Sequence, residues 1–294
     1  MSRRGRPGAD HISVEPLTPA IGAEIGGVDL SQPLSPAQFE EIRAAFVSHH
    51  VLVFRDQHLA PEDHKRFARM FGSLHIHPYH AKQAAPEHAK SGPASDPEIL
   101  EVKADENSRN VAGEEWHTDV TCDAEPPMGS MLYLTTMPAG GGGDTCFINT
   151  IRAFEALSPT MQEIVKGLTA VHDGAKLYTG GYGTAVPEGG WPRCTHPVAI
   201  CQPESGRRAL FVNRGFTTRI NEFSRAESDA FLEMLWRHIE SHVEFQCRVR
   251  WNANTLTFWD NRVTQHHSVW DYYPQTRYGR RVSIVGARPA SGLD

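Results

Sequence analysis

The hydrophobic pattern in the first third of the chain predicts helices that alternate with short strands. Residues 12–30 mix brief apolar alternations with proline and glycine, which is typical of short strands joined by turns. Ser35 is placed to cap a helix with Pro36 in its first turn, because the apolar residues that follow recur at helical spacing. Residues 51–54 are continuously apolar and predict a buried strand. Residues 61–71 repeat the helical pattern up to a glycine stop.

The rest of the chain has the pattern of many strands and a few helices. Apolar residues at helical spacing predict helices over residues 151–157, 158–168 and 224–241. Alternating apolar residues predict strands over residues 98–103, 209–213, 244–251, 255–259 and 281–287. Because strands recur at regular intervals with few helices between them, we expect a sandwich or barrel of antiparallel sheets rather than a doubly wound parallel sheet.

Two segments lack the periodicity of helices and strands. Residues 81–97 carry proline, alanine, serine, lysine and glutamate and predict a long loop, of the kind that often forms a lid or a binding segment. Residues 177–193 are rich in glycine and predict a second flexible loop. Its aromatic residues either close over a site or form surface turns with local packing; they are Tyr178, Tyr182 and Trp191.

Composition places the chain among ordered globular proteins. With 39% hydrophobic and 22% charged residues in 294, we expect a disordered tail at residues 1–11 and a single domain over residues 12–294. A net charge of -6 without a dense basic block argues against nucleic acid and favours a small-molecule partner. No run reaches the roughly 18 apolar residues of a membrane span, and residues 1–10 lack the apolar core of a secretion signal, so we expect a cytoplasmic protein without membrane contact. The five cysteines are widely spaced, and we expect reduced thiols.

His117 and Asp119 stand two residues apart, ahead of a glycine-rich turn at residues 140–143. Alternate residues of an extended strand share one face, so both side chains can aim at one metal ion. The pair alone is a weak signal, because a His-x-Asp pair arises by chance in a chain with 16 histidines. Residues 75–80 carry three more histidines, for which we prefer a pocket wall or plain surface polarity to metal binding.

A third ligand from the C-terminal region would complete a metal site. If His266 joins the pair, two imidazoles and one carboxylate hold one face of the metal and leave positions open, which suits non-haem Fe(II) oxygen chemistry. A structural zinc site normally needs four protein ligands, usually with cysteine, and none is offered here. His267 is the alternative ligand, but only one of two neighbours in a strand can face inward, and the register favours His266.

Several motifs in the right order resemble the taurine/2,4-D dioxygenase family of Fe(II)/2-oxoglutarate-dependent enzymes. They are His117-x-Asp119, GGDT at 142–145, WDNR at 259–262, QH at 265–266 and the arginines at 277 and 281. Three further segments resemble the taurine dioxygenase branch in particular: GAEIGGVDL at 22–30, FG at 71–72 with HIHP at 75–78, and FVNRGFTTR at 211–219. The resemblance covers residues 12–289 and implies a mainly β fold with flanking helices, a double-stranded β-helix or cupin-like jelly-roll.

The resemblance implies roles by position for the metal and the co-substrate. His117, Asp119 and His266 match the iron ligands of the family. Thr145 matches a hydroxyl that bonds a carboxylate of 2-oxoglutarate, and Arg277 matches the guanidinium that clamps its far carboxylate. The resemblance therefore implies Fe(II), 2-oxoglutarate as co-substrate and O2, with succinate and CO2 as products.

A small anionic organic substrate is implied in the same way. Arg281 and His77 match residues that contact the sulfonate of taurine, and Phe216 lies in a motif shared with that branch. A taurine- or alkylsulfonate-like substrate is therefore expected. A homo-oligomer is expected as well.

The substrate pocket departs from the taurine pattern. Gly113 stands where a taurine enzyme has an asparagine, and Leu177 with Tyr178 replaces a Ser-Phe pair. Tyr79 and His80 alter another contact. Losing the asparagine amide removes a polar contact, so we expect an anionic head group on a body larger or more apolar than taurine.

Other interpretations stay open. An aryloxyalkanoate, another carboxylate or a sulfate ester could replace the sulfonate, and desaturation could replace hydroxylation. A cupin-like metal-binding protein without catalysis should lack a paired Arg277 and Thr145. A zinc hydrolase needs a general base, and Glu115 points to the metal face only if the strand register is regular. Arg281 could instead pair with a surface carboxylate.

Overall fold

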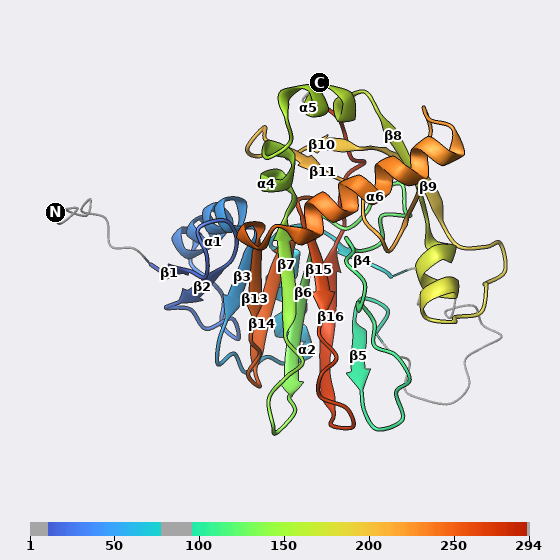
Figure 1. Ribbon diagram of the computed structural model, residues 1–294. Coiled ribbons are helices and arrows are strands. Elements are labelled where there is room, and N and C mark those ends of the chain that lie inside the picture. The colour runs from blue at the N-terminus through green and yellow to red at the C-terminus, as the bar shows by residue number, and fades with distance from the viewer. Residues whose placement is uncertain (1–10, 78–95, 293–294) are drawn as a thin grey trace.

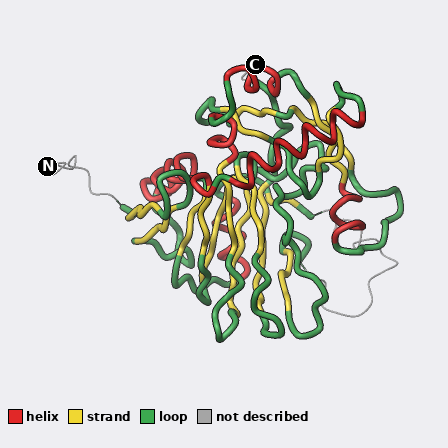
Figure 2. Tube along the Cα trace, in the orientation of Figure 1, coloured by secondary structure: helices red, strands yellow, loops and turns green. Residues whose placement is uncertain are grey.

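Two facing β-sheets form the centre of the molecule (Figures 1 and 2). The computed structural model describes residues 11–77 and 96–292. The larger sheet has eight strands in the order β1 (Ser13–Pro16), β2 (Ala23–Gly26), β3 (Val51–Phe54), β14 (Thr255–Asp260), β6 (Gly129–Thr136), β16 (Arg277–Ile284) and β4 (Leu74–His75), with β5 (Leu100–Ala104) also paired to β16. The smaller sheet contains β13 (Gln246–Val249), β7 (Thr145–Asn149) and β15 (Thr264–Ser268).

This arrangement is the expected jelly-roll, and its strands are antiparallel except for the parallel contact of β2 with β3. The alternation of side chains along β6 shows how one strand serves two layers. Met131 and Tyr133 point into the core under the N-terminal helices, whereas Leu132 and Leu134 point between the two sheets. The space between the sheets also receives Phe147 from the smaller sheet, which places a hydrophobic floor beneath the pocket described below.

Helices α1 (Pro36–His49) and α2 (Pro61–Arg69) cover the outer face of the larger sheet. Ser35 caps α1 as predicted, since its hydroxyl accepts from the N–H of Gln38 while the Gln38 side chain accepts from the N–H of Ser35. Phe46 of α1 stacks on Phe258 of β14 with ring centroids 4.0 Å apart. The second helix ends at Arg69, two residues earlier than predicted.

A further layer packs on one end of the jelly-roll. It contains α4 (Thr150–Glu155), α5 (Pro159–Lys166) and α6 (Arg225–Ser241), the sheet of β8 (Thr169–Asp173), β9 (Arg193–Pro197) and β12 (Thr217–Ile220), and the hairpin of β10 (Ala199–Cys201) and β11 (Arg208–Leu210). The three predicted helices are thus confirmed, and α6 crosses above the strand ends in Figure 1. Within the described residues, no helix combines the length and apolar character needed to cross a membrane.

Several predicted elements differ from the structure. Residues 177–193 are not entirely a loop, because a π-helix, η2 (Lys176–Gly181), opens the segment and buries Leu177 and Tyr178 against Phe216. Apolar burial therefore outweighs the glycine content there. A 3₁₀ turn, η3 (Val243–Phe245), precedes β13 where one longer strand was predicted. The last strand begins at Arg277 rather than at Arg281.

The early start of β16 depends on one glycine. A Cβ at Gly279 would lie 2.2 Å from the backbone oxygen of Tyr133, so only glycine lets the two strands approach this closely. Because β16 is extended from Arg277 onward, Arg277 and Arg281 project to the same side of the strand. Both arginines thereby reach one cavity.

Some predictions fall outside the described residues. They concern the tail at residues 1–10, residues 81–95 of the first loop, and Tyr79 with His80. All five cysteines are free thiols, as expected.

Candidate metal centre and substrate cavity

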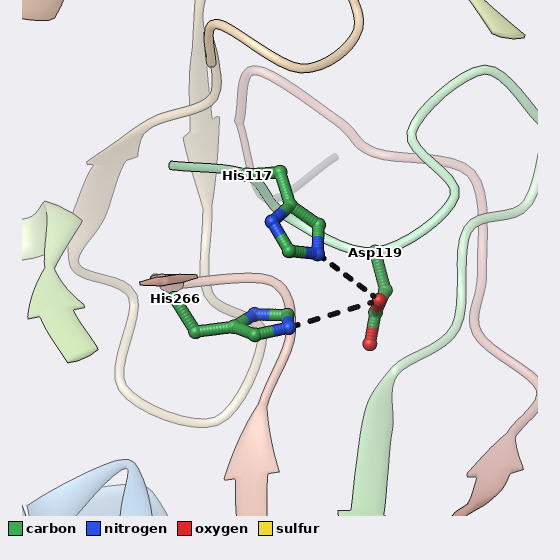
Figure 3. Close-up of side chains that lie close together, drawn as sticks. All are labelled: His117, Asp119 and His266. Carbon is green, nitrogen blue, oxygen red and sulfur yellow. Dashed lines mark ion pairs between the residues drawn. The ribbon is translucent and has the colours of Figure 1, made fainter. Parts of the chain in front are cut away.

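Three side chains converge at the mouth of the jelly-roll to form a candidate metal centre (Figure 3). His117, Asp119 and His266 each offer one ligand atom, and these atoms lie within 4.8 Å of one another. The Nε2 atoms of His117 and His266 lie 3.7 and 3.9 Å from Oδ1 of Asp119. All three residues are buried. The grouping predicted from sequence is therefore formed.

The backbone that carries this centre is not the continuous strand that was expected. His117 makes an isolated antiparallel bridge to His266, with mutual N–H···O bonds of 3.1 and 2.8 Å. Asp119 already lies in a turn, and Val120 after it has a φ of 53°. The bridge sets the two imidazoles side by side, with ring centroids 4.1 Å apart, and the turn swings the carboxylate toward them.

Hydrogen bonds outside the centre orient its first two ligands. Nδ1 of His117 donates to the carbonyl of Glu115 at 2.7 Å, which leaves Nε2 as the free lone pair that faces the centre. The side-chain amide of Asn261 accepts from the N–H of Asp119 at 2.8 Å and donates to its carbonyl at 2.9 Å. The same Nδ2 donates to Pro127, so Asn261 fixes the turn that presents Asp119.

The Asp119 carboxylate is held by two donors. Ser130 Oγ donates to Oδ2 at 2.9 Å, and Arg281 Nη1 donates to Oδ1 at 2.7 Å. Burial alone would raise the pKa of Asp119, but the charge of Arg281, the largest opposing influence, helps to outweigh burial, and the pKa lies well below its usual value. Burial likewise keeps the pKa of His266 well below its usual value. A carboxylate and a neutral imidazole are the protonation states that bind a metal.

The donor set fits Fe(II) with open coordination positions. Two imidazoles and one carboxylate occupy one side, and among the described residues no further histidine, cysteine or carboxylate joins this group. Glu115, the residue considered as the general base of a zinc hydrolase, is exposed, does not line the cavity and contributes only its carbonyl to His117. His267 points away, and its ring lies against Trp116. Of the two neighbouring histidines, His266 is therefore the one whose side chain faces His117 and Asp119.

A buried arginine lies deeper in the same cavity. Arg277 is 3% exposed, and neither its Nε nor its Nη2 has an acceptor among the described residues. Its guanidinium lies 5.6 Å from the ring of Trp251, whose Nε1 donates to Thr145 Oγ1 at 3.0 Å. Asp144, whose negative charge acts on Arg277, is instead engaged by Arg248 at 2.7 Å. An unpaired, buried planar cation of this kind is suited to bind a carboxylate.

One cavity of about 380 Å³ connects these groups. All of the site residues predicted from the sequence line it: His77, Gly113, His117, Asp119, Thr145, Tyr178, Phe216, His266, Arg277 and Arg281. Tyr178 hydroxyl and His77 Nε2 are 3.5 Å apart. Arg281 faces the cavity and pairs with Asp119, so the alternative pairing with a surface carboxylate is wrong.

Several lining residues were not predicted as site residues. Trp251 and Tyr272 line the cavity near Arg277, and Ser268, Asn110 and Tyr182 line it near Gly113. Their side chains come from loops and strand ends that meet only in the folded chain. The sequence gives an indication for Tyr182, because the aromatic residues of its glycine-rich segment are one candidate for closing over a site.

The fold is a mainly β jelly-roll, and its cavity joins an open centre of two histidines and one carboxylate to a buried arginine. This combination defines the class of 2-oxoglutarate-dependent non-haem iron dioxygenases. The family model described as "Taurine catabolism dioxygenase TauD, TfdA family" matches residues 13–283, and the chain belongs to that family. The resemblance seen in the sequence is thus confirmed.

Relatives of known activity support the same class. The chain is 35% identical over 304 residues to the alpha-ketoglutarate-dependent sulfate ester dioxygenase of Pseudomonas putida, covering 98% of this chain and 94% of the relative. It is 30% identical to the alpha-ketoglutarate-dependent 2,4-dichlorophenoxyacetate dioxygenase of Cupriavidus pinatubonensis, covering 94% and 95%. The crystal structure of a taurine dioxygenase from Burkholderia xenovorans superposes with a TM-score of 0.78 at 33% identity, covering 95% of this chain and 92% of that one.

Proposed function

We propose that this dioxygenase hydroxylates a sulfate ester or sulfonate whose carbon body is apolar, with 2-oxoglutarate and O2 consumed and succinate and CO2 formed. The observation that carries the proposal is the state of Arg281. Its Nη1 is bonded to Asp119, but its buried Nε has no acceptor among the described residues, and the side chain lines the cavity. An anionic head group placed against Arg281, with His77 beside it, would supply that acceptor.

The remaining polar residues divide the cavity into two ends. His117, Asp119 and His266 would hold Fe(II), while Arg277 would hold the far carboxylate of 2-oxoglutarate and the hydroxyl of Thr145 would bond a carboxylate of the same molecule. When bound, Fe(II) and 2-oxoglutarate together activate O2, so that one oxygen atom enters succinate and the other enters a substrate C–H bond.

The apolar wall next to Asp119 positions that C–H bond. Val120, Leu177, Tyr178 and Phe216 pack into one cluster that lines the cavity and keeps water from the reacting carbon. If the hydroxylated carbon bears the sulfur or the ester oxygen, the product collapses. The C–O bond becomes a carbonyl, the hydroxyl proton is lost, and sulfite or sulfate leaves with the bonding electron pair.

An aryloxyalkanoate is the second candidate substrate class. The substrate end of the cavity is lined by aromatic rings, with Tyr178 and Phe216 in edge-to-face contact at 5.6 Å, and a flat aryl ether would pack against such rings. The 2,4-dichlorophenoxyacetate relative acts on a compound of this class. Hydroxylation of the carbon next to the ether oxygen would release a phenol in the same way.

A substrate panel tests the proposal. Purified protein with Fe(II) and 2-oxoglutarate would be offered alkyl sulfates, alkylsulfonates and aryloxyacetates, and succinate formed above the substrate-free level would be measured. We expect sulfates or sulfonates to give the largest increase. An increase with aryloxyacetates alone would select the second class, and no increase with any of these anions would refute both.

The role of Arg281 needs its own variant. Arg281→Lys keeps the charge but loses the planar set of donors, so we expect kcat/KM for the anionic substrate to fall about tenfold or more while 2-oxoglutarate binding is retained. Arg280→Lys is the matched control, because Arg280 lies next along β16 and its Nη2 donates to the carbonyl of Leu59. Equal kinetics for the two variants would contradict the role of Arg281.

A further inference from the structure

Tyr182 spans the substrate end of the cavity. It follows η2 directly, and its hydroxyl accepts a hydrogen bond of 2.7 Å from the backbone N–H of Gly113. The carbonyl of the same tyrosine receives a longer bond, 3.5 Å, from the side chain of Asn110. Residues 110–113 and the end of η2 are far apart in the sequence, so this contact ties two separate walls of the cavity together.

The close packing around Gly113 is possible because glycine has no side chain. Its φ is +90°, and a Cβ built on it would lie 3.0 Å from Ser268 Oγ and 3.1 Å from Cε1 of His117. Its carbonyl also receives the N–H of Ser268 at 2.7 Å. The backbone at Gly113 is thus pressed against the ring of a metal ligand, and any side chain that contacts the substrate at this point must come from elsewhere. The side chain of Tyr182 reaches this point through its hydrogen bond with Gly113.

The ring of Tyr182 is held firmly enough to serve as a wall. Its N–H donates to the carbonyl of Leu177 at 2.9 Å, and the ring packs against the apolar cluster that contains Val120 and Phe216. Burial raises the pKa of Tyr182 to about 12, so the phenol is neutral at physiological pH. A neutral phenol that accepts one bond from Gly113 keeps its own proton to donate.

We propose that Tyr182 is a specificity-determining residue: its hydroxyl is latched to Gly113, and its ring closes the substrate end of the cavity and limits the length of the apolar body. The inference rests on the proposed function, because it concerns the substrate of that same site. Asn110 and Thr184 also line the cavity, but neither of them carries a ring.

Two variants separate the hydrogen bond between Gly113 and the Tyr182 hydroxyl, here called the latch, from the ring of Tyr182, here called the wall. Tyr182→Phe removes the hydroxyl and keeps the ring, whereas Tyr182→Ala opens the end of the cavity. Tyr273→Phe is the matched control, since Tyr273 is 60% exposed and does not line the cavity. The measurements are kcat/KM for a series from ethyl to octyl sulfate or sulfonate, and the ratio of 2-oxoglutarate consumed to product formed.

For Tyr182→Ala, we expect the octyl-to-ethyl ratio of kcat/KM to rise by about tenfold or more, because a methylene that enters an apolar pocket is worth a several-fold change in kcat/KM. For Tyr182→Phe, we expect that ratio to stay near the wild-type value, with about a fivefold higher KM and more 2-oxoglutarate consumed without product, since one hydrogen bond is lost. An octyl-to-ethyl ratio that Tyr182→Ala leaves within about twofold of wild type would overturn the proposed wall.

A measurement that needs no catalysis tests the role of Tyr182 independently of the proposed substrate class. The N–H of Gly113 should exchange with deuterium about fivefold faster in Tyr182→Phe than in the Tyr273→Phe control, because the latch protects it. Unchanged exchange would overturn the latch even if the enzyme is active. Failure of the wild type to turn over any sulfate or sulfonate, together with faster exchange in Tyr182→Phe, would refute the proposed substrate class and leave the latch supported.

Discussion

Replacing Arg277 by methionine should make the protein more stable and at the same time unable to bind its co-substrate. The guanidinium is 3% exposed, and two of its nitrogens have no acceptor among the described residues. Burial lowers the pKa of Arg277, which reflects the same cost of placing its charge there. Replacing a buried charge by an apolar side chain of similar volume is worth about 1–4 kcal/mol, so the methionine should raise the unfolding free energy of the ligand-free protein by about 1–4 kcal/mol.

The loss of binding follows from the same atoms. Two charge-assisted hydrogen bonds to a carboxylate are worth about 1.5–3 kcal/mol each, so the Kd for 2-oxoglutarate should rise by about 10²- to 10⁴-fold. Urea unfolding gives the first quantity, and anaerobic calorimetric titration of 2-oxoglutarate with Mn(II) gives the second. Arg280→Met, on the outer side of the same strand, is the control and should leave 2-oxoglutarate binding unchanged. A methionine variant that binds within about threefold of wild type, or that is less stable, would refute the reasoning.

Three further perturbations test the surroundings of the centre. Gly113→Ala should weaken metal binding about tenfold in a metal titration, because the added Cβ would press on the imidazole of His117. Gly141→Ala is the control, because Gly141 also has a positive φ, +82°, but has nothing within 4 Å of an added Cβ. It should cost only the backbone strain of about 1–2 kcal/mol and leave the metal affinity unchanged. Asn261→Ala removes three buried hydrogen bonds around the Asp119 turn and should cost about 2–3 kcal/mol in urea unfolding, with weaker metal binding; unchanged metal affinity would contradict its positioning role. Burial lowers the pKa of His50 to about 4, so the folded state favours the neutral imidazole. The unfolding free energy should therefore fall by about 3 kcal/mol as the pH drops from about 6.5 to about 4. His50→Asn should flatten that part of the pH profile of urea unfolding, and an unchanged profile would contradict this role of His50.

The sequence predicts most of the site because its polar groups are carried by short motifs. His117 and Asp119 are two residues apart, and His266 lies on a strand that pairs with the same loop, so their convergence follows once the sheet order is known. The alternation of apolar residues also predicts the central strands, such as residues 255–259. These features depend on local spacing, which a sequence displays directly.

The features that escaped prediction depend on distant contacts. Tyr182 reaches Gly113 only because η2 folds back over the loop at residues 110–113, and glycine-rich spacing alone predicts a flexible loop there. The early start of β16 at Arg277 depends on Gly279 passing close to Tyr133. Turn geometry also replaced the strand expected at Asp119, because its carboxylate is drawn to Arg281 and Ser130 on the larger sheet. Such contacts are set by packing between elements.

The central claim is that this chain couples substrate oxidation to 2-oxoglutarate through the three-residue centre. The most direct test is a reaction under ¹⁸O₂ with Fe(II), 2-oxoglutarate and an alkyl sulfate or sulfonate, followed by mass spectrometry of the succinate. We predict substrate-dependent succinate that carries one ¹⁸O atom, and none from His117→Ala, which loses one of the three ligands. Unlabelled succinate, or labelled succinate formed at the wild-type rate by His117→Ala, would contradict the claim.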